Sequence, residues 1–181
     1  MADPAPPPLV KLLCGMISAS SELFDDAAEG MTRTFGPVEL AGEVMDFEFT
    51  HYYDAEMGSP LKRRLVAFRD CVAPDAIVEA KHATNALEAE FARRAGGRPP
   101  RPINLDPGYL EASKLVLASM KNFSHRIYLG RGVYAEVTLM YHKGRWEALP
   151  WTFPDYASGR YDPFLTRVRS RYREQLREES E

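Results

Sequence analysis

The residues with the clearest chemical potential form a charged pair on either side of a predicted hairpin turn. Arg126 precedes the turn Gly130–Gly132 and Glu136 follows it, within alternating apolar and polar residues. A three-residue loop with a left-handed glycine would pair Leu129 with Val133. Because side chains alternate between the faces of a strand, this register places the arginine opposite the glutamate. A register shifted by one residue would mix the two faces.

This hairpin face has two readings. Tyr128 and Tyr134 share it with the charged pair, whereas Ile127, Leu129 and Val133 point to the other face, which we predict to be core. In one reading, Arg126 and Glu136 are a surface ion pair worth about 0.2–1 kcal/mol. In the other reading, the face is the floor of a ligand site. Arginine then binds an anion, glutamate orients the ligand and the tyrosines stack on it.

A second polar group follows a short predicted strand. Asn104 and Asp106 lie on one side of it, and the Pro-Gly dipeptide that follows is predicted to turn the chain beside Tyr109 and Lys114. The asparagine and aspartate either cap their own backbone in this turn or present a carboxylate at the end of the strand. In the second reading, Asp106 and Glu136 are the candidate catalytic groups.

Two aromatic loops are predicted to wall such a site. One spans 50–58 and the other spans 149–156, and both are too rich in aromatic residues for plain connections. The predicted ligand-binding residues are Arg126, Tyr128, Tyr134, Asn104, Tyr109, Lys114, Tyr53, Glu56 and Trp151.

Familiar catalytic and metal motifs are not found in the sequence. The four histidines lack metal-ligand spacing, so no metal ligand can be named, and any cofactor is unknown at this stage. Cys14 and Cys71 are expected to be reduced and mostly buried. A Ser-His-Asp or Cys-His arrangement cannot be named, which leaves it open whether the protein is an enzyme.

The order of elements predicts an α+β fold. The expected elements are strand 9–17, helix 20–35, strands 41–49 and 61–72, helix 75–94, strands 102–106, 114–120, 125–129 and 133–142, and a final helix from 162. The first four strands and two helices read β-α-β-β-α-β, which is the order of a ferredoxin-like fold. We therefore predict a two-layer sandwich with a mostly antiparallel sheet and helices on one face. A hairpin and a C-terminal helix are added to it.

Bulk properties limit the domain organisation and partners. Residues 1–8 are expected to be a disordered Pro-rich tail, and residues 9–181 a single domain. The formal net charge of −3 disfavours a protein that coats nucleic acid. Neither a leader nor a membrane span is evident, so we expect a cytoplasmic protein. The last helix carries several arginines, which form either a solvated basic face or an RNA contact.

Several segments resemble a known family. They include Asn104–Leu110 (NLDPGYL), Ser124–Gly130 (SHRIYLG) and Leu149–Thr152 (LPWT). Over about residues 9–177 the chain resembles the uncharacterised prokaryotic family named domain of unknown function 4416. This resemblance implies no established activity, although some relatives carry the automatic label GTP-binding protein. The chain contains neither a phosphate-binding G-x-x-x-x-G-K-[ST] loop nor an Asn-Lys-x-Asp motif.

The leading hypothesis is a domain that binds, or acts on, an anionic and nucleotide-like small molecule. Its site would join the hairpin face to the turn after Asp106 and to the loop 50–58. One alternative is an RNA- or protein-binding adaptor that uses the Arg-rich C-terminal helix. Another is GTP binding, as the family's label implies.

Overall fold

The computed structural model describes residues 3–50 and 54–178. Its strands are β1 (Val10–Ser18), β2 (Val38–Ala41), β3 (Met45–Asp46), β4 (Lys62–Val72), β5 (Asn104–Leu110), β6 (Lys114–Ser119), β7 (Ile127–Gly130), β8 (Val133–His142) and β9 (Arg145–Ala148). Its helices are α1 (Glu22–Phe35), α2 (Asp54–Met57), α3 (Ala76–Arg94), α4 (Pro154–Ala157) and α5 (Asp162–Glu178).

The described strands form one antiparallel sheet in the order β2-β4-β1-β5-β6-β8-β7. The short strand β3 pairs with β4, and β9 pairs with β8. Strand β1 lies between β4 and β5 and is buried at every position, as its nearly continuous apolar run predicts. The α+β class and the mostly antiparallel sheet are confirmed.

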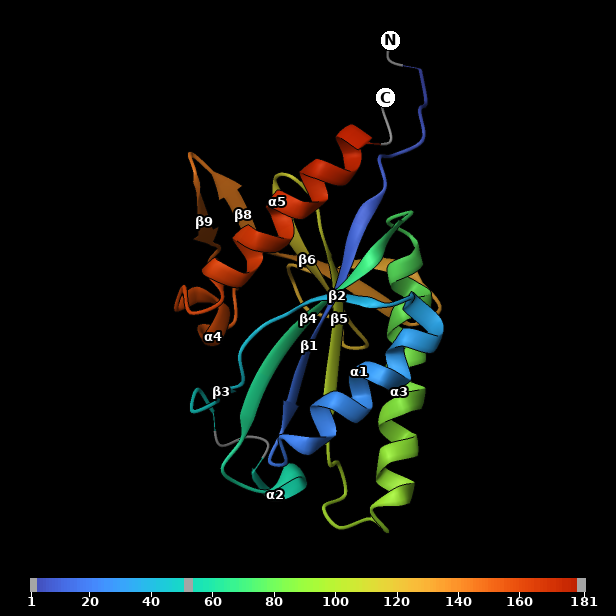
Figure 1. The fold of residues 1–181 in the computed structure, drawn as a ribbon, viewed down its shortest axis with the longest axis vertical. Coiled ribbons are helices and arrows are strands. Elements are labelled where there is room, and N and C mark those ends of the chain that lie inside the picture. The colour runs from blue at the N-terminus through green and yellow to red at the C-terminus, as the bar shows by residue number, and fades with distance from the viewer. Residues whose placement is uncertain (1–2, 51–53, 179–181) are drawn as a thin grey trace.

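Helices α1 and α3 form a layer on one face of the sheet (Figure 1). Phe24 and Met31 of α1 and Phe91 of α3 pack with Cys14 and Met16 of β1. This face follows from the helical spacing of the apolar residues, which gives each helix one buried stripe. The sheet and these two helices make the predicted two-layer sandwich.

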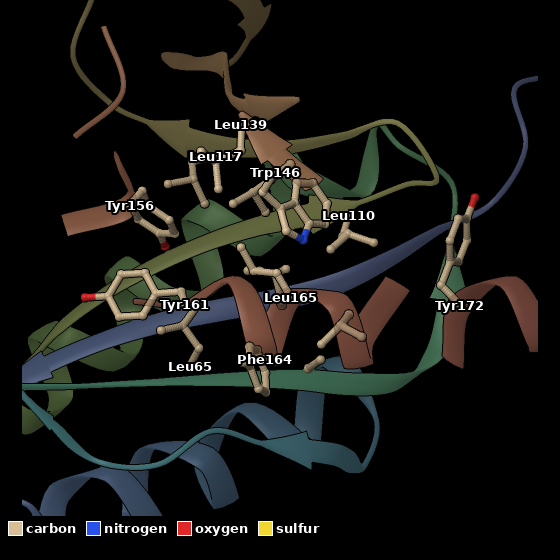
Figure 2. Packing of buried hydrophobic residues seen from close by; sticks show 14 residues of the cluster. Leu65, Leu110, Leu117, Leu139, Trp146, Tyr156, Tyr161, Phe164, Leu165 and Tyr172 are labelled. Carbon is tan, nitrogen blue, oxygen red and sulfur yellow. The ribbon is translucent and has the colours of Figure 1, made fainter. Parts of the chain in front are cut away.

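Helix α5 packs on the opposite face, which corrects the expectation that all helices share one face. Its Phe164, Leu165 and Val168 pack in one cluster with Leu13 and Leu65, which alternate with the residues facing α1. Figure 2 shows Phe164 and Leu165 in this cluster with Leu65. Strands with apolar residues on both faces require cover on both sides. The sheet face beside α5 is therefore only partly open.

Two predicted boundaries are wrong. The expected strand 41–49 is two short strands, β2 and β3, and both pair with β4. The expected turn at Pro107–Gly108 lies inside β5, with Pro107 opposite Cys14. The glycine is required there because a Cβ would lie 2.3 Å from the Val116 carbonyl oxygen. Close approach of β6, rather than a turn, explains the glycine of this dipeptide.

The hairpin β7–β8 has nearly the predicted register. Tyr128 pairs with Tyr134 as predicted, but Gly130 rather than Leu129 pairs with Val133, after an irregularity in β7. Val133 is buried, whereas Ile127 and Leu129 are exposed. These two residues are not core because β7 is the edge strand of the sheet.

Strands β5 and β6 pair only at Gly108–Leu110 with Leu115–Leu117. Beyond this stretch, side chains of α3 form hydrogen bonds with the backbone of Leu105. Glu88 accepts from its N–H at 2.7 Å, and Lys81 donates to its carbonyl at 3.1 Å. The sheet therefore opens beside the first residues of β5. None of the described helices is long and apolar enough to span a membrane.

Candidate functional site

A cleft of about 710 Å³ lies where β5 and β6 diverge. Side chains from β4, α3, β5, β6 and β8 line it, together with residues of the 42–50 segment and the start of α4. Its volume falls within the range of about 300–1,000 Å³ that is usual for ligand pockets. The described residues contain no cluster of three histidine, cysteine or acidic side chains that could hold a metal ion.

Asp106 is the central carboxylate on the β5 side of the cleft. Asn104 donates a hydrogen bond from Nδ2 to Asp106 Oδ2 at 2.7 Å. Lys81 Nζ and Arg63 Nη2 each lie 3.9 Å from one of its two oxygens. The side chain keeps 31 % of its surface exposed, so a ligand in the cleft can reach it.

Arg63 is a buried guanidinium beneath Asp106. Its Nη1 contacts Asp155 Oδ2 at 2.8 Å, and its Nη2 donates to the Tyr156 hydroxyl at 2.9 Å. The rings of Phe47, Tyr156 and Tyr161 surround the guanidinium carbon at 4.8–5.7 Å. Burial raises the pKa of Tyr156 above its ordinary value, so this phenol stays a neutral acceptor. The arginine thereby joins β4 to α4.

Helix α3 contributes a polar stripe to the cleft. Lys81, Asn85 and Glu88 recur at helical spacing and all line it. Arg101 donates to Glu88 and to the Asn104 side-chain oxygen. Burial raises the pKa of Glu88, although Arg101 and the Leu105 N–H oppose this shift.

Glu136 is the carboxylate on the β8 side. Its Oε2 accepts hydrogen bonds from Arg126 Nε and His125 Nε2, each at 2.7 Å. Arg126 also donates from Nη1 to Ser119 Oγ and to the Lys121 carbonyl, at 3.0 and 2.9 Å. The predicted Arg126–Glu136 contact is therefore present, and it lies on the face away from the core around Val137.

Trp151 supports this group from outside the cleft. Its ring stacks on His125 with centroids 5.2 Å apart, and its Nε1 donates to the Val137 carbonyl at 2.8 Å. The residues that line the cleft with an apolar surface are Ile17, Phe47, Phe49, Leu117, Ala118, Met120, Phe153, Pro154 and Tyr156. The cleft thus combines a charged floor with aromatic walls.

Four of the predicted site residues meet in the cleft: Asn104, Asp106, Arg126 and Glu136. Tyr53 lies outside the described residues. Glu56 is exposed on α2 and does not line the cleft.

Four other predicted residues also lie elsewhere, for identifiable reasons. Tyr128 and Tyr134 contact each other near the tip of the hairpin, with centroids 5.1 Å apart. Because β5 does not turn at Pro107–Gly108, strand alternation places Tyr109 on the face opposite Asp106. Lys114 lies at the far end of the β5–β6 hairpin, 2.9 Å from Glu111.

The predicted wall 149–156 does contribute Phe153, Pro154, Asp155 and Tyr156, and the predicted wall 50–58 contributes Thr50. Sequence reasoning missed several other cleft residues: Arg63, Lys81, Asn85, Glu88, Arg101 and Lys121. The spacing of the α3 stripe was a usable signal. Three polar residues on one side of a helix, next to its apolar stripe, indicate a polar environment at the edge of the core. Arg63 lies two residues before Leu65 and four before Ala67, so it shares their buried face of β4, which was a second signal.

The chain belongs to the family described as Domain of unknown function (DUF4416), which it matches over residues 8–172. No curated protein and no solved structure gives a significant match to it. The Gly130–Gly132 turn joins two strands, β7 and β8, and therefore lacks the strand–loop–helix setting of a phosphate-binding loop.

Proposed function

We propose that this protein binds a small molecule with an anionic group and a flat, apolar body, as in a nucleotide. The observation that carries the proposal is the convergence of basic side chains and aromatic walls in one cleft. Five basic residues line it (Arg63, Lys81, Arg101, Lys121 and Arg126), against four acidic ones (Asp106, Glu88, Glu136 and Asp155). A ligand that presents both a negative charge and polar donors fits this mixture.

The acidic and basic groups divide into two sets. Near β5, the charges of Arg63, Lys81 and Arg101 are matched by Asp106, Glu88 and Asp155. Near β6 and β8, the described residues that line the cleft include two basic side chains, Arg126 and Lys121, and one acidic side chain, Glu136. The described lining residues are thus more basic on the β6–β8 side, and this supports placing the anionic group of the ligand there.

Lys121 is the more accessible anion-binding candidate of the two, because its side chain is exposed and that of Arg126 is half-buried. Two of the Arg126 nitrogens already donate to Glu136, Ser119 and the Lys121 carbonyl, so this residue acts mainly by holding its neighbours. Lys121 is exposed at the edge of the cleft, where an ammonium can approach a phosphate or carboxylate. Asp106, half-exposed in the same cleft, is the candidate group for acting on a bound ligand.

The arrangement β2-β4-β1-β5, connected through α1 and α3, supports a ferredoxin-like assignment for this half of the sheet.

The test is a thermal-shift panel of nucleoside monophosphates, sugar phosphates and inorganic phosphate. A ligand at one hundred times its Kd stabilises a protein by about 2.7 kcal/mol, which is readily seen as a rise in Tm. We expect nucleotides to raise the Tm more than sugar phosphates or phosphate do, because only nucleotides also cover the aromatic walls.

Two matched pairs of variants locate the site. Phe153→Ala, in the cleft wall, should weaken binding, whereas Tyr128→Ala, at an exposed ring near the tip of the β7–β8 hairpin and outside the cleft, should not. Lys121→Gln should weaken binding more than Arg167→Gln, which removes the same charge from α5. A panel without any shift, or equal effects within both pairs, would contradict the proposal.

A further inference from the structure

Glu136 has one satisfied and one unsatisfied carboxylate oxygen. Oε2 accepts two hydrogen bonds, whereas Oε1 accepts none from the described residues. The side chain is only 2 % exposed, so Oε1 is shielded from bulk solvent. A buried acceptor without a donor destabilises the folded protein, and the cost is greater for a charged group. Since Glu136 lines the cleft, the cleft is where a donor can be supplied.

The surrounding residues fix the orientation of this carboxylate. Arg126 cannot easily shift, because Ser119 and the Lys121 carbonyl also hold it. His125, the other donor, is fixed against Trp151 by stacking. The carboxylate therefore keeps Oε2 toward β7 and holds Oε1 in place before a ligand arrives. A preorganised acceptor of this kind selects for a complementary donor.

We propose that Glu136 reads the ligand: its Oε1 accepts a hydrogen bond from an exocyclic amino group on a nucleotide base. This inference rests on the proposed function. A sugar phosphate could also donate from a hydroxyl, but it offers no flat apolar surface to Phe153 and Leu117. An oxo group in place of the amino group would put two acceptors in contact. The ligand class is therefore an amino-substituted nucleotide.

The wild-type protein is tested first, by calorimetric titration with nucleotides that differ in one amino group. The pairs are adenosine and nebularine monophosphate, guanosine and inosine monophosphate, and cytidine and zebularine monophosphate. A hydrogen bond to a charged group predicts that at least one amino nucleotide binds on the order of 10- to 100-fold more tightly than its partner.

The variant Glu136→Gln should reverse the preference between donor and acceptor groups on the ligand. Arg126 donates to whichever atom takes the place of Oε2, so it holds the amide oxygen there and leaves the amide nitrogen in the place of Oε1. The position then donates instead of accepting. We expect the variant to lose the wild-type preference for the amino nucleotide. Between cytidine and uridine monophosphate, it should favour uridine monophosphate, because the uracil oxo group accepts a hydrogen bond. Glu147→Gln, at a glutamate outside the cleft, is the control and should keep the wild-type preference.

The outcomes separate the two proposals. If no nucleotide binds, the proposed function fails and this inference fails with it. If amino and deamino nucleotides bind wild-type protein equally well, Oε1 does not accept from the amino group, so the inference alone is overturned. Should Glu136→Gln fail to fold, the wild-type comparison still decides. A folded variant with the wild-type preference would also overturn it.

Discussion

At the scale of single residues, the cleft is built from buried charges that each have several partners. Arg63 is held by Asp155 and Tyr156, and Glu136 is held by Arg126 and His125. Removing one partner of a buried charge costs about 3–5 kcal/mol, because the other charge stays behind without compensation. The positions of these side chains are thus fixed by the same contacts that stabilise the fold.

Gly15→Ala tests how tightly Arg63 is held. A Cβ at this position would lie 2.5 Å from Arg63 Nη2 and 3.1 Å from the Tyr156 hydroxyl. Because the guanidinium is buried and bound to Asp155, it cannot move aside freely. We expect a loss of about 1–3 kcal/mol in the free energy of unfolding, as in other overpacked cores. Urea denaturation measures it.

Gly30→Ala on α1 is the control for this change. Its Cβ would meet only the flexible end of Leu87, and alanine favours a helix by up to about 1 kcal/mol over glycine. If Gly15→Ala were no more destabilising than Gly30→Ala, Arg63 would be far more mobile than its contacts indicate.

Thiol labelling tests the packing around Cys14. This residue is fully buried in β1, and burial raises the pKa of its thiol far above the ordinary value. The thiolate is the reactive form, so native protein should leave Cys14 unmodified by a thiol reagent, and urea should expose it. Rapid labelling of Cys14 in native protein, read by peptide mass spectrometry, would refute this expectation.

At the scale of elements, Glu39 connects three parts of the fold. It lies on β2, contacts the fully buried ammonium of Lys11 on β1, and accepts from Arg171 on α5 at 2.7 Å. Burial alone would raise the pKa of Glu39, but hydrogen bonds from Arg171 and Lys11 hold it below its ordinary value of 4.5. This one carboxylate therefore helps to hold α5 on its face of the sheet.

Glu39→Gln should destabilise the protein at neutral pH by up to about 3–5 kcal/mol, because it removes the charged partner of a buried lysine. Since the folded pKa is lowered, the wild-type stabilisation is present above the ordinary value of 4.5 and is lost as the pH falls through the folded pKa. Urea denaturation should therefore show a clear difference in unfolding free energy between wild type and variant at neutral pH. This difference should shrink as the pH falls through the folded pKa. Glu43→Gln, at an exposed glutamate, should change stability by less than about 0.5 kcal/mol.

Local patterns predicted most of the long elements. An apolar run identified β1, helical spacing identified α1 and α3, and alternation identified β8 and the Arg126–Glu136 contact. These features depend on residues close in the chain. They were sufficient for the α+β class and for four of the cleft residues.

The remainder depends on tertiary approach. Pro107–Gly108 has the composition of a turn, but the close passage of β6 requires the glycine within a strand. Lys81 and Glu88 enter the site because β5 and β6 diverge and leave the Leu105 backbone to α3. No pattern within α3 predicts where the sheet opens, so the α3 side of the cleft could not be located from sequence.

At the scale of the whole molecule, charge distinguishes the cleft from the Arg-rich surface of α5. The helix could suggest RNA binding, but several of its arginines serve the fold. Arg169 donates to the Ala112 carbonyl, and Arg171 contacts Glu39, Glu174 and Glu178. With a formal net charge of −3, the chain lacks the general basic field that attracts phosphate backbones. The basic helix is therefore interpreted as structural.

This interpretation predicts weak RNA binding at physiological salt. Fluorescence anisotropy with a labelled single-stranded RNA should give no submicromolar complex. Any binding at low salt should vanish as salt is added, because salt reduces the free energy gained when bound counterions leave the RNA. A triple variant removes three exposed charges of α5 through the substitutions Arg167→Gln, Arg173→Gln and Arg177→Gln. It should leave nucleotide binding in the cleft unchanged. A submicromolar RNA complex that weakens steeply with salt and is lost in this variant would make α5 the functional surface. Phe153→Ala separates the two sites, because it should weaken nucleotide binding without affecting an RNA complex on the helix.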